Sequence, residues 1–218
     1  MPYLSCDVLD EVPLEHDPFD FVVVPDFICR EALVGICADF PEVPGTGSYP
    51  PSELKIVGHF AGLLDELNGE SFRKSVEAKF SVDLGAAPTM MTVRGHIGKR
   101  DGAIHTDSST KIITVLLYFN DSWAADGGRL RLLRSGTDLE DYAVEVPPLG
   151  GTLLVFRRAD NSWHGHKLHE GPRRAIQFNW VTSQEVVDRE QARHRFSTRL
   201  KKLTGIFARP GRSEAAAA

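Results

Sequence analysis

The sequence predicts a mainly β fold with flanking helices, of the α+β class. From Met90 to Thr182, short apolar-rich segments alternate with turns that contain Gly, Pro, Asp and Asn. Many short strands without helices between them are typical of a closed or double-sheet β body and argue against alternating βαβ units. Before Met90, apolar residues recur instead at intervals of three and four, which is the spacing of amphipathic helices. The expected strands are 90–97, 103–107, 111–120, 128–133, 142–146, 151–156 and 173–182.

The N-terminal part is expected to contribute one strand and three helices. Phe19–Val24 predicts the strand, and residues 29–40 predict a helix whose apolar face comes from Ala32, Leu33, Ile36 and Phe40. Two further helices are predicted between Ile56 and Phe80, broken near Asn68–Gly69. The Pro- and Gly-rich segment 41–54 is either a plain connector or a loop with a role at a binding site.

The length of 218 residues suits one domain with a substantial apolar core. We expect a single domain over residues 1–210. Its parts are a strand with supporting helices in 1–87, the β core in 88–183 and a charged C-terminal helix in 184–207.

Charge and composition narrow the functional classes. The net charge of −5 gives no general basic field for nucleic acid, which leaves room only for a local patch. The acidic N-terminus does not read as a secretory signal, and no apolar run approaches the roughly 20 residues that span a bilayer. The three cysteines show no CxxC spacing, so neither a disulfide framework nor a zinc knuckle is indicated. We expect a cytoplasmic protein that binds neither nucleic acid nor membranes.

The segment Ile104–Lys111, with the sequence IHTDSSTK, contains the clearest candidate for chemistry. In a strand, His105 and Asp107 would share one face because they lie two residues apart. A second imidazole would complete the two-His-one-carboxylate triad that holds Fe(II) with open positions. His164, in the sequence SWHG, is available downstream. Alone, the H-x-D pattern favours a solvated or core-satisfied His beside a surface Asp over a metal site.

The order of the motifs strengthens this interpretation. An H-x-D pair, a long apolar strand, a Gly-Gly turn, further strands, a His and then a strand headed by Arg follow one another between Met90 and Val181. This order resembles the Fe(II)- and 2-oxoglutarate-dependent dioxygenase superfamily, in its prolyl 4-hydroxylase-like branch. The resemblance implies a double-stranded β-helix, or jelly roll, for the β core. It also implies Fe(II), 2-oxoglutarate and O2 as cofactor and co-substrates, with ascorbate supporting turnover.

The resemblance also implies roles for individual residues. Ser162-Trp163-His164-Gly165 matches the family's setting for the distal iron ligand and favours His164 over His166 and His169. No catalytic side chain is expected beyond the metal ligands His105, Asp107 and His164. In the strand after the motif, Ile112, Thr114, Leu116 and Tyr118 should face the interior, with Tyr118 and Thr114 contacting 2-oxoglutarate; Tyr118 could instead have an ordinary buried partner. The opposite face is uniformly apolar and should pack against helices.

Either Arg173 or Arg174 could bind the distal carboxylate of 2-oxoglutarate. Strand alternation places Arg173 with Ala175, Gln177 and Asn179, whereas Arg174 shares a face with Ile176, Phe178 and Trp180. A polar face with a small residue beside the Arg suits a ligand-lined interior, and the family pattern aligns with Arg173. A planar guanidinium can pair with a carboxylate through two parallel hydrogen bonds. We therefore predict that Arg173 binds the co-substrate.

The substrate is the most open question. The expected substrate-facing residues are Arg94, His166, Gln177 and Asn179, which can bond hydroxyls, amides or carboxylates. Arg94 lies near the region where prolyl hydroxylases commonly carry a Tyr. We expect hydroxylation of an unactivated C–H of a polar small molecule or sugar-like metabolite. The alternatives are a prolyl or other protein side-chain hydroxylase, a non-catalytic cupin-like module that binds metal or sugar, and a zinc hydrolase with the same ligands.

Overall fold

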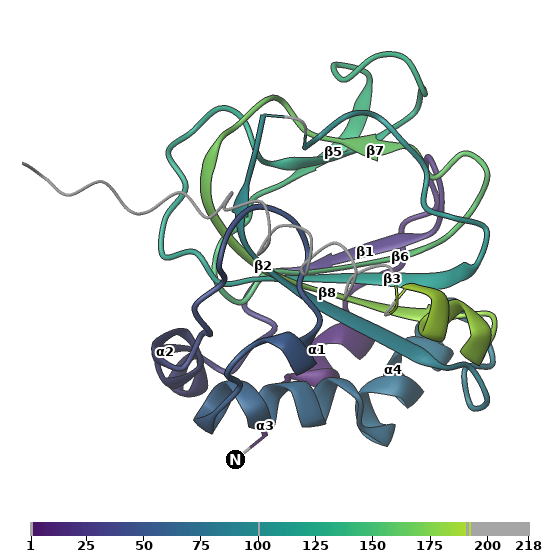
Figure 1. Ribbon diagram of the computed structural model, residues 1–218. Helices are drawn as coiled ribbons and strands as arrows, with labels where there is room; N and C mark the ends of the chain where they lie inside the picture. Colours follow the sequence, from purple (N-terminus) through teal and green to yellow (C-terminus); the bar gives the residue numbers. More distant parts are fainter. Residues whose placement is uncertain (1, 100, 191, 193–218) are drawn as a thin grey trace, which may run out of the picture.

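The computed structural model describes residues 2–99, 101–190 and 192. Two sheets and a layer of helices make up this part of the chain (Figure 1). The larger, five-stranded sheet has the order β1-β6-β3-β8-β2, and the smaller, three-stranded sheet has the order β5-β4-β7. The strands of the larger sheet are β1 (Phe21–Val24), β2 (Thr89–Ile97), β3 (Lys111–Tyr118), β6 (Leu153–Arg157) and β8 (Gly171–Val181). Those of the smaller sheet are β4 (Leu130–Leu133), β5 (Tyr142–Val146) and β7 (His164–Gly165).

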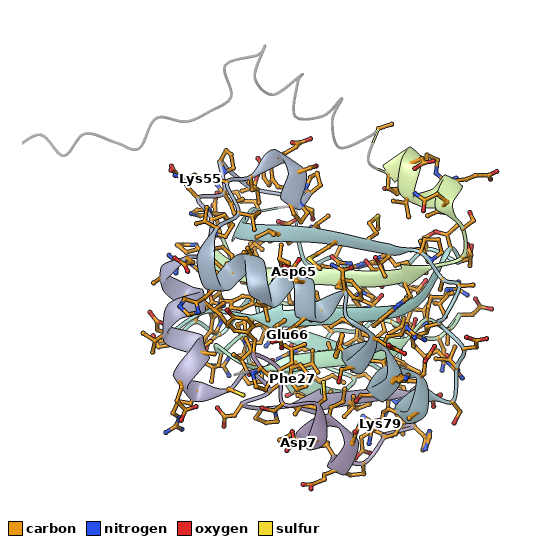
Figure 2. All side chains as sticks on the ribbon, turned by 90° about the horizontal axis from the view of Figure 1, so that it is seen from below. Asp7, Phe27, Lys55, Asp65, Glu66 and Lys79 are labelled. Carbon is orange, nitrogen blue, oxygen red and sulfur yellow. The ribbon has the colours of Figure 1, made fainter. Side chains whose placement is uncertain are left out.

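The helices cover the outer face of the five-stranded sheet, and the three-stranded sheet faces its inner side (Figure 1). They are α1 (Cys6–Glu11), α2 (Arg30–Ala38), α3 (Gly58–Leu67) and α4 (Glu70–Phe80), with a short 3-10 helix, η1 (Pro51–Glu53). Figure 2 looks onto this helical face and shows Glu66 of α3, which accepts hydrogen bonds from the backbone N–H groups of Tyr3 and Leu4. The N-terminus is thereby held on α3.

Strand alternation divides the apolar residues between two cores. On β3, Ile113, Val115 and Leu117 pack with the helices, whereas Tyr118 joins a smaller cluster between the sheets. The expected faces are confirmed except at Ile112, which packs on the helical side. The reason is a bulge in the β3–β8 pairing between Lys111 and Ile113, because an extra residue reverses the alternation locally. The bulge turns Lys111 toward the inner face.

The expected strands and helices are present except for the strand at 103–107, and α1 and β7 were not expected from the sequence. Residues 103–107 do not form a strand, because His105 makes only one isolated bridge and its neighbours do not continue the pairing. The segment 41–54 is not a plain connector, because Thr46 pairs with His96 and Tyr49 with Val93 along β2. Residues 184–190 are helical, and most of the rest of the expected C-terminal helix lies outside the described residues. Within the described part, no helix is both long and apolar enough to cross a bilayer.

Candidate active site

The bridge between His105 and His164 brings together two residues that are far apart in the sequence. Each backbone N–H donates to the other's carbonyl, at N···O distances of 3.0 and 2.9 Å. Directly opposed residues of an antiparallel pair place their side chains on the same face. The two imidazole rings consequently lie with their centroids 4.3 Å apart.

Both imidazoles are oriented by a backbone carbonyl two residues earlier in the chain. Nδ1 of His105 lies 2.8 Å from the oxygen of Ala103, and Nδ1 of His164 lies 2.9 Å from that of Ser162. A carbonyl only accepts, so each Nδ1 carries the proton and each Nε2 keeps a free lone pair. This arrangement fixes the tautomer that metal-ligating imidazoles use. Together with Asp107, the two side chains offer ligand atoms that all lie within 4.8 Å of one another.

The carboxylate of Asp107 is buried and held at both oxygens. Lys111 Nζ lies 2.7 Å from Oδ1, and the Thr114 hydroxyl donates to Oδ2 at 2.5 Å. Asn179 in turn donates to the Thr114 oxygen at 2.8 Å. Burial raises the pKa of Asp107, but Lys111, His164 and the two hydrogen bonds outweigh it and leave the pKa below its usual value. Asp107 therefore presents an anionic carboxylate with a fixed orientation.

His164 is neutral in this environment. Burial lowers its pKa to about 4, with a further contribution from His105, against the opposing effect of Asp107. A neutral imidazole can bind a metal without first losing a proton. The donor set of two imidazoles and one carboxylate fits Fe(II).

A cavity of about 240 Å³ lies beside these three side chains, with Arg173 in its wall. Arg173 is 5% exposed, its Nη2 donates to the Tyr118 hydroxyl at 3.1 Å, and its buried Nε has no hydrogen-bond partner. A buried guanidinium with an unused donor is costly unless an anion completes it. Burial also raises the pKa of Tyr118, against the effect of Arg173 and Arg94, so the phenol keeps a proton to donate. A carboxylate fits this end of the cavity.

The two arginines at the start of β8 lie on opposite faces, as the alternation predicts. Arg174 is exposed, with its guanidinium carbon 5.3 Å from the ring centroid of Phe40 on the helical side. Ala175 and Gln177 line the cavity with Arg173. Arg173 is thus the arginine that faces the cavity, and its binding of 2-oxoglutarate stays a prediction.

A second pocket, of about 420 Å³, adjoins the cavity and shares Arg94, His105, Asp107 and Gln177 with it. Most of the side chains found only in this pocket carry hydroxyl, amide or charged groups. They include Ser48, Thr92, Thr106, Ser108, Thr110, Lys111, Asn179 and Glu190. Three of the expected substrate-facing residues, Arg94, Gln177 and Asn179, therefore line it.

His166 lies on the inner cavity and not in the second pocket. Its Nδ1 lies 2.9 Å from the Lys167 carbonyl, and burial lowers its pKa. Gly102 passes close to the ring with φ +95°, and a Cβ at that position would lie 2.5 Å from the imidazole. His169 instead lies against Trp123, with ring centroids 4.8 Å apart. Of the three histidine candidates, His164 alone belongs to the metal-binding cluster found among the described residues.

Sequence reasoning did not assign Lys111 or Ser48 to the site. The separation of four residues between Asp107 and Lys111 gave a weak signal, but the contact depends on the bulge in β3. Ser48 reaches the site because segment 41–54 pairs with β2, where its Oγ accepts a hydrogen bond from Arg94 at 2.8 Å. No periodic pattern in the sequence predicts that pairing.

Comparison with known proteins identifies this constellation. Residues 91–182 match the family model described as the 2OG-Fe(II) oxygenase superfamily, and this span contains all three candidate iron ligands. The chain therefore contains a 2OG-Fe(II) oxygenase superfamily core over residues 91–182. It is accordingly a 2-oxoglutarate-dependent dioxygenase that uses Fe²⁺ and 2-oxoglutarate, with O2 as the second co-substrate.

Solved structures with the same fold support the jelly-roll assignment for this 2OG-Fe(II) oxygenase. A Pseudomonas putida prolyl-4-hydroxylase matches with 16% identity and a TM-score of 0.51, over 82% of this chain and 94% of that one. The viral collagen prolyl hydroxylase of Paramecium Bursaria Chlorella virus-1 matches with 12% identity and a TM-score of 0.51, over 79% and 94% of the two chains. A Trichoplax adhaerens prolyl hydroxylase, solved with a hypoxia inducible factor peptide fragment, matches with 16% identity and a TM-score of 0.50, over 81% and 88%. No curated protein sequence matches the chain.

Proposed function

We propose that this oxygenase hydroxylates an unactivated C–H of a polar small molecule or sugar-like metabolite. In this proposal His105, Asp107 and His164 hold Fe(II), while Arg173 and Tyr118 hold the distal carboxylate of 2-oxoglutarate. When bound, the iron and 2-oxoglutarate supply the oxidising chemistry, with succinate and carbon dioxide as co-products. The protein positions the reacting groups and excludes water.

The chain's own groups have distinct tasks. His105 and His164 present free Nε2 lone pairs because backbone carbonyls accept from their Nδ1–H groups. Arg173 donates to the Tyr118 oxygen, so the phenol proton remains available for a second hydrogen bond to the same carboxylate. The guanidinium and the phenol would thus fix both the affinity and the direction of the co-substrate.

The observation that carries the proposal is the buried Arg173 with an unpartnered Nε in the wall of a cavity that also contains the three metal ligands. A cupin-like binding module or a zinc hydrolase needs the ligands but has no need for a buried cation beside them. A dicarboxylate that binds metal at one end does need one. The arrangement therefore favours a 2-oxoglutarate-dependent oxygenase over both alternatives.

The choice of a small polar substrate is supported by the second pocket, whose hydroxyl and amide groups suit a hydroxylated or amide-bearing ligand. The alternative, hydroxylation of a prolyl or other protein side chain, is supported by the shared fold of the prolyl hydroxylases and is at least as strong. A cytoplasmic setting, which would keep iron ferrous, is part of the proposal.

Succinate release tests the reaction and the substrate separately. Iron-loaded protein should form succinate from 2-oxoglutarate, and metal-stripped or zinc-loaded protein should not. Stimulation of succinate release is then screened over metabolite pools and prolyl peptide libraries. Stimulation by metabolites supports the proposed substrate class, and stimulation by prolyl peptides alone would replace it with the alternative. Absence of any iron-dependent succinate would contradict the proposed reaction itself.

A further inference from the structure

Arg94 occupies the boundary between the inner cavity and the second pocket, since it lines both. Its Nε donates to Ser48 Oγ at 2.8 Å, and Ser48 belongs to the second pocket only. This bond fixes the plane of the guanidinium and uses one donor. The two terminal nitrogens have no hydrogen bond or ion pair to any other described residue.

No described residue forms an ion pair with Arg94, although the carboxylate of Asp101 lies in the wall of the same cavity. Burial lowers the pKa of Arg94, and nearby Arg173 lowers it further, whereas Asp101 opposes these effects without forming an ion pair. The Asp101 carboxylate instead accepts the Gly98 N–H at 2.9 Å. Arg94 therefore lies in a pocket wall without an ion pair to a described residue, close enough to the buried guanidinium of Arg173 for that charge to lower its pKa.

One molecule of 2-oxoglutarate does not supply the missing charge. Of its two carboxylates, one belongs at the metal and the other at Arg173 and Tyr118, under the proposed function on which this inference rests. A guanidinium fixed by Ser48 at the mouth of the second pocket is therefore left for another anion. Its terminal nitrogens match the planar, two-oxygen face of a carboxylate or a phosphate.

We propose that the primary substrate carries a carboxylate or phosphate group, and that Arg94 binds it and holds the reactive C–H at the iron. Ser48 is a positioning residue in this arrangement. Lys111, the other cation of the second pocket, is already paired with Asp107 and is not available for the same role. The inference selects anionic metabolites from the wider class of polar small molecules.

Binding to matched pairs of compounds tests this without turnover. The probes are glucose with glucuronate, glycerol with glycerol 3-phosphate, and N-acetylprolinamide with N-acetylproline, each added to protein loaded with Zn²⁺ and 2-oxoglutarate. Ligand-observed NMR gives the affinities. In the wild type, the anionic member of at least one pair should bind about tenfold or more tightly than its neutral partner. Equal binding of both members in every pair, or binding of none, would overturn the proposal.

Three variants test whether Arg94 causes the tighter binding of the anionic compounds. Arg94→Gln should abolish it, and Ser48→Ala should weaken it while the charge remains. Arg174→Gln, which removes an exposed arginine from the outer face, should keep it. Persistence of the preference in Arg94→Gln would overturn the proposal. Near-ultraviolet circular dichroism confirms that each variant is folded, and the serine variant provides the test if the arginine variant is not.

The affinity for 2-oxoglutarate shows whether Arg94 binds an anionic group of the primary substrate or a carboxylate of 2-oxoglutarate. If Arg94 binds the substrate, Arg94→Gln should change the affinity for 2-oxoglutarate by less than about threefold. A loss as large as that of an Arg173 variant would place Arg94 in the co-substrate site and refute the inference while leaving the proposed function intact. Failure of the wild type to bind 2-oxoglutarate at all would instead refute the proposed function.

Discussion

Replacement of Arg173 by alanine should sharply reduce the affinity for 2-oxoglutarate, whereas the same change at the adjacent Arg174 should not. Arg173 is 5% exposed and has an unpartnered Nε as well as a hydrogen bond to Tyr118, so an incoming carboxylate completes a buried charge. Arg174 is exposed on the helical side of β8 and contacts the ring of Phe40. The two substituted residues are adjacent in the sequence, but their side chains lie on opposite faces of the sheet.

The magnitude follows from the burial. Removing one partner of a buried, hydrogen-bonded charge pair costs about 2–5 kcal/mol, which corresponds to a loss of roughly 30-fold or more in affinity. At Arg174 the solvated cation makes no contact in the cavity, so the change should be less than about twofold. Arg173→Lys should recover only part of the loss, because an ammonium cannot make the same two parallel hydrogen bonds.

Calorimetric titration of 2-oxoglutarate into Mn²⁺-loaded protein measures these affinities directly. Thermal unfolding of each metal-free variant separates a loss of binding from a loss of folding. Equal losses in the two alanine variants, or a larger loss in Arg174→Ala, would refute the assignment that rests on the strand faces.

Three further predictions concern the metal ligands and their supports. His164→Ala should lose bound iron and turnover, while His166→Ala should retain the metal; metal analysis showing the reverse would disprove the choice of ligand. Thr114→Val removes the donor to Asp107 and should weaken metal binding about tenfold with little effect on 2-oxoglutarate, measured by competition with a chelator. Metal-free protein should lose stability as the pH falls from 7 to 5, because the unfolded chain protonates His164 below pH 6.5 whereas the folded chain does so only near pH 4. This residue contributes about 2 kcal/mol of that loss, and urea unfolding of the wild type and His164→Gln at both pH values should show a smaller loss in the variant.

The spacing of residues along the chain was sufficient to predict many of the helices, the strand faces and part of the candidate metal site. The spacing of apolar residues predicted α2, α3 and α4 but not α1, and alternation along β3 and β8 separated the helix-facing residues from those that face the cavity. The spacing of His105 and Asp107 predicted a shared face that the structure retains without a regular strand. These features depend on neighbours within a few residues, so a single sequence is sufficient to predict them.

The tertiary structure decided the features that depend on long-range pairing. Strand alternation places His164 and His166 on one face. The family resemblance favoured His164, and the bridge to His105 brings His164 into the candidate metal-binding cluster. The bulge that turns Lys111 toward Asp107 is a property of the β3–β8 register, which periodicity assumes to be regular. Ser48 reaches Arg94 across 46 positions because segment 41–54 pairs with β2. Each contact depends on the register between segments that are distant in the chain, and this register is set by the packing of the whole fold.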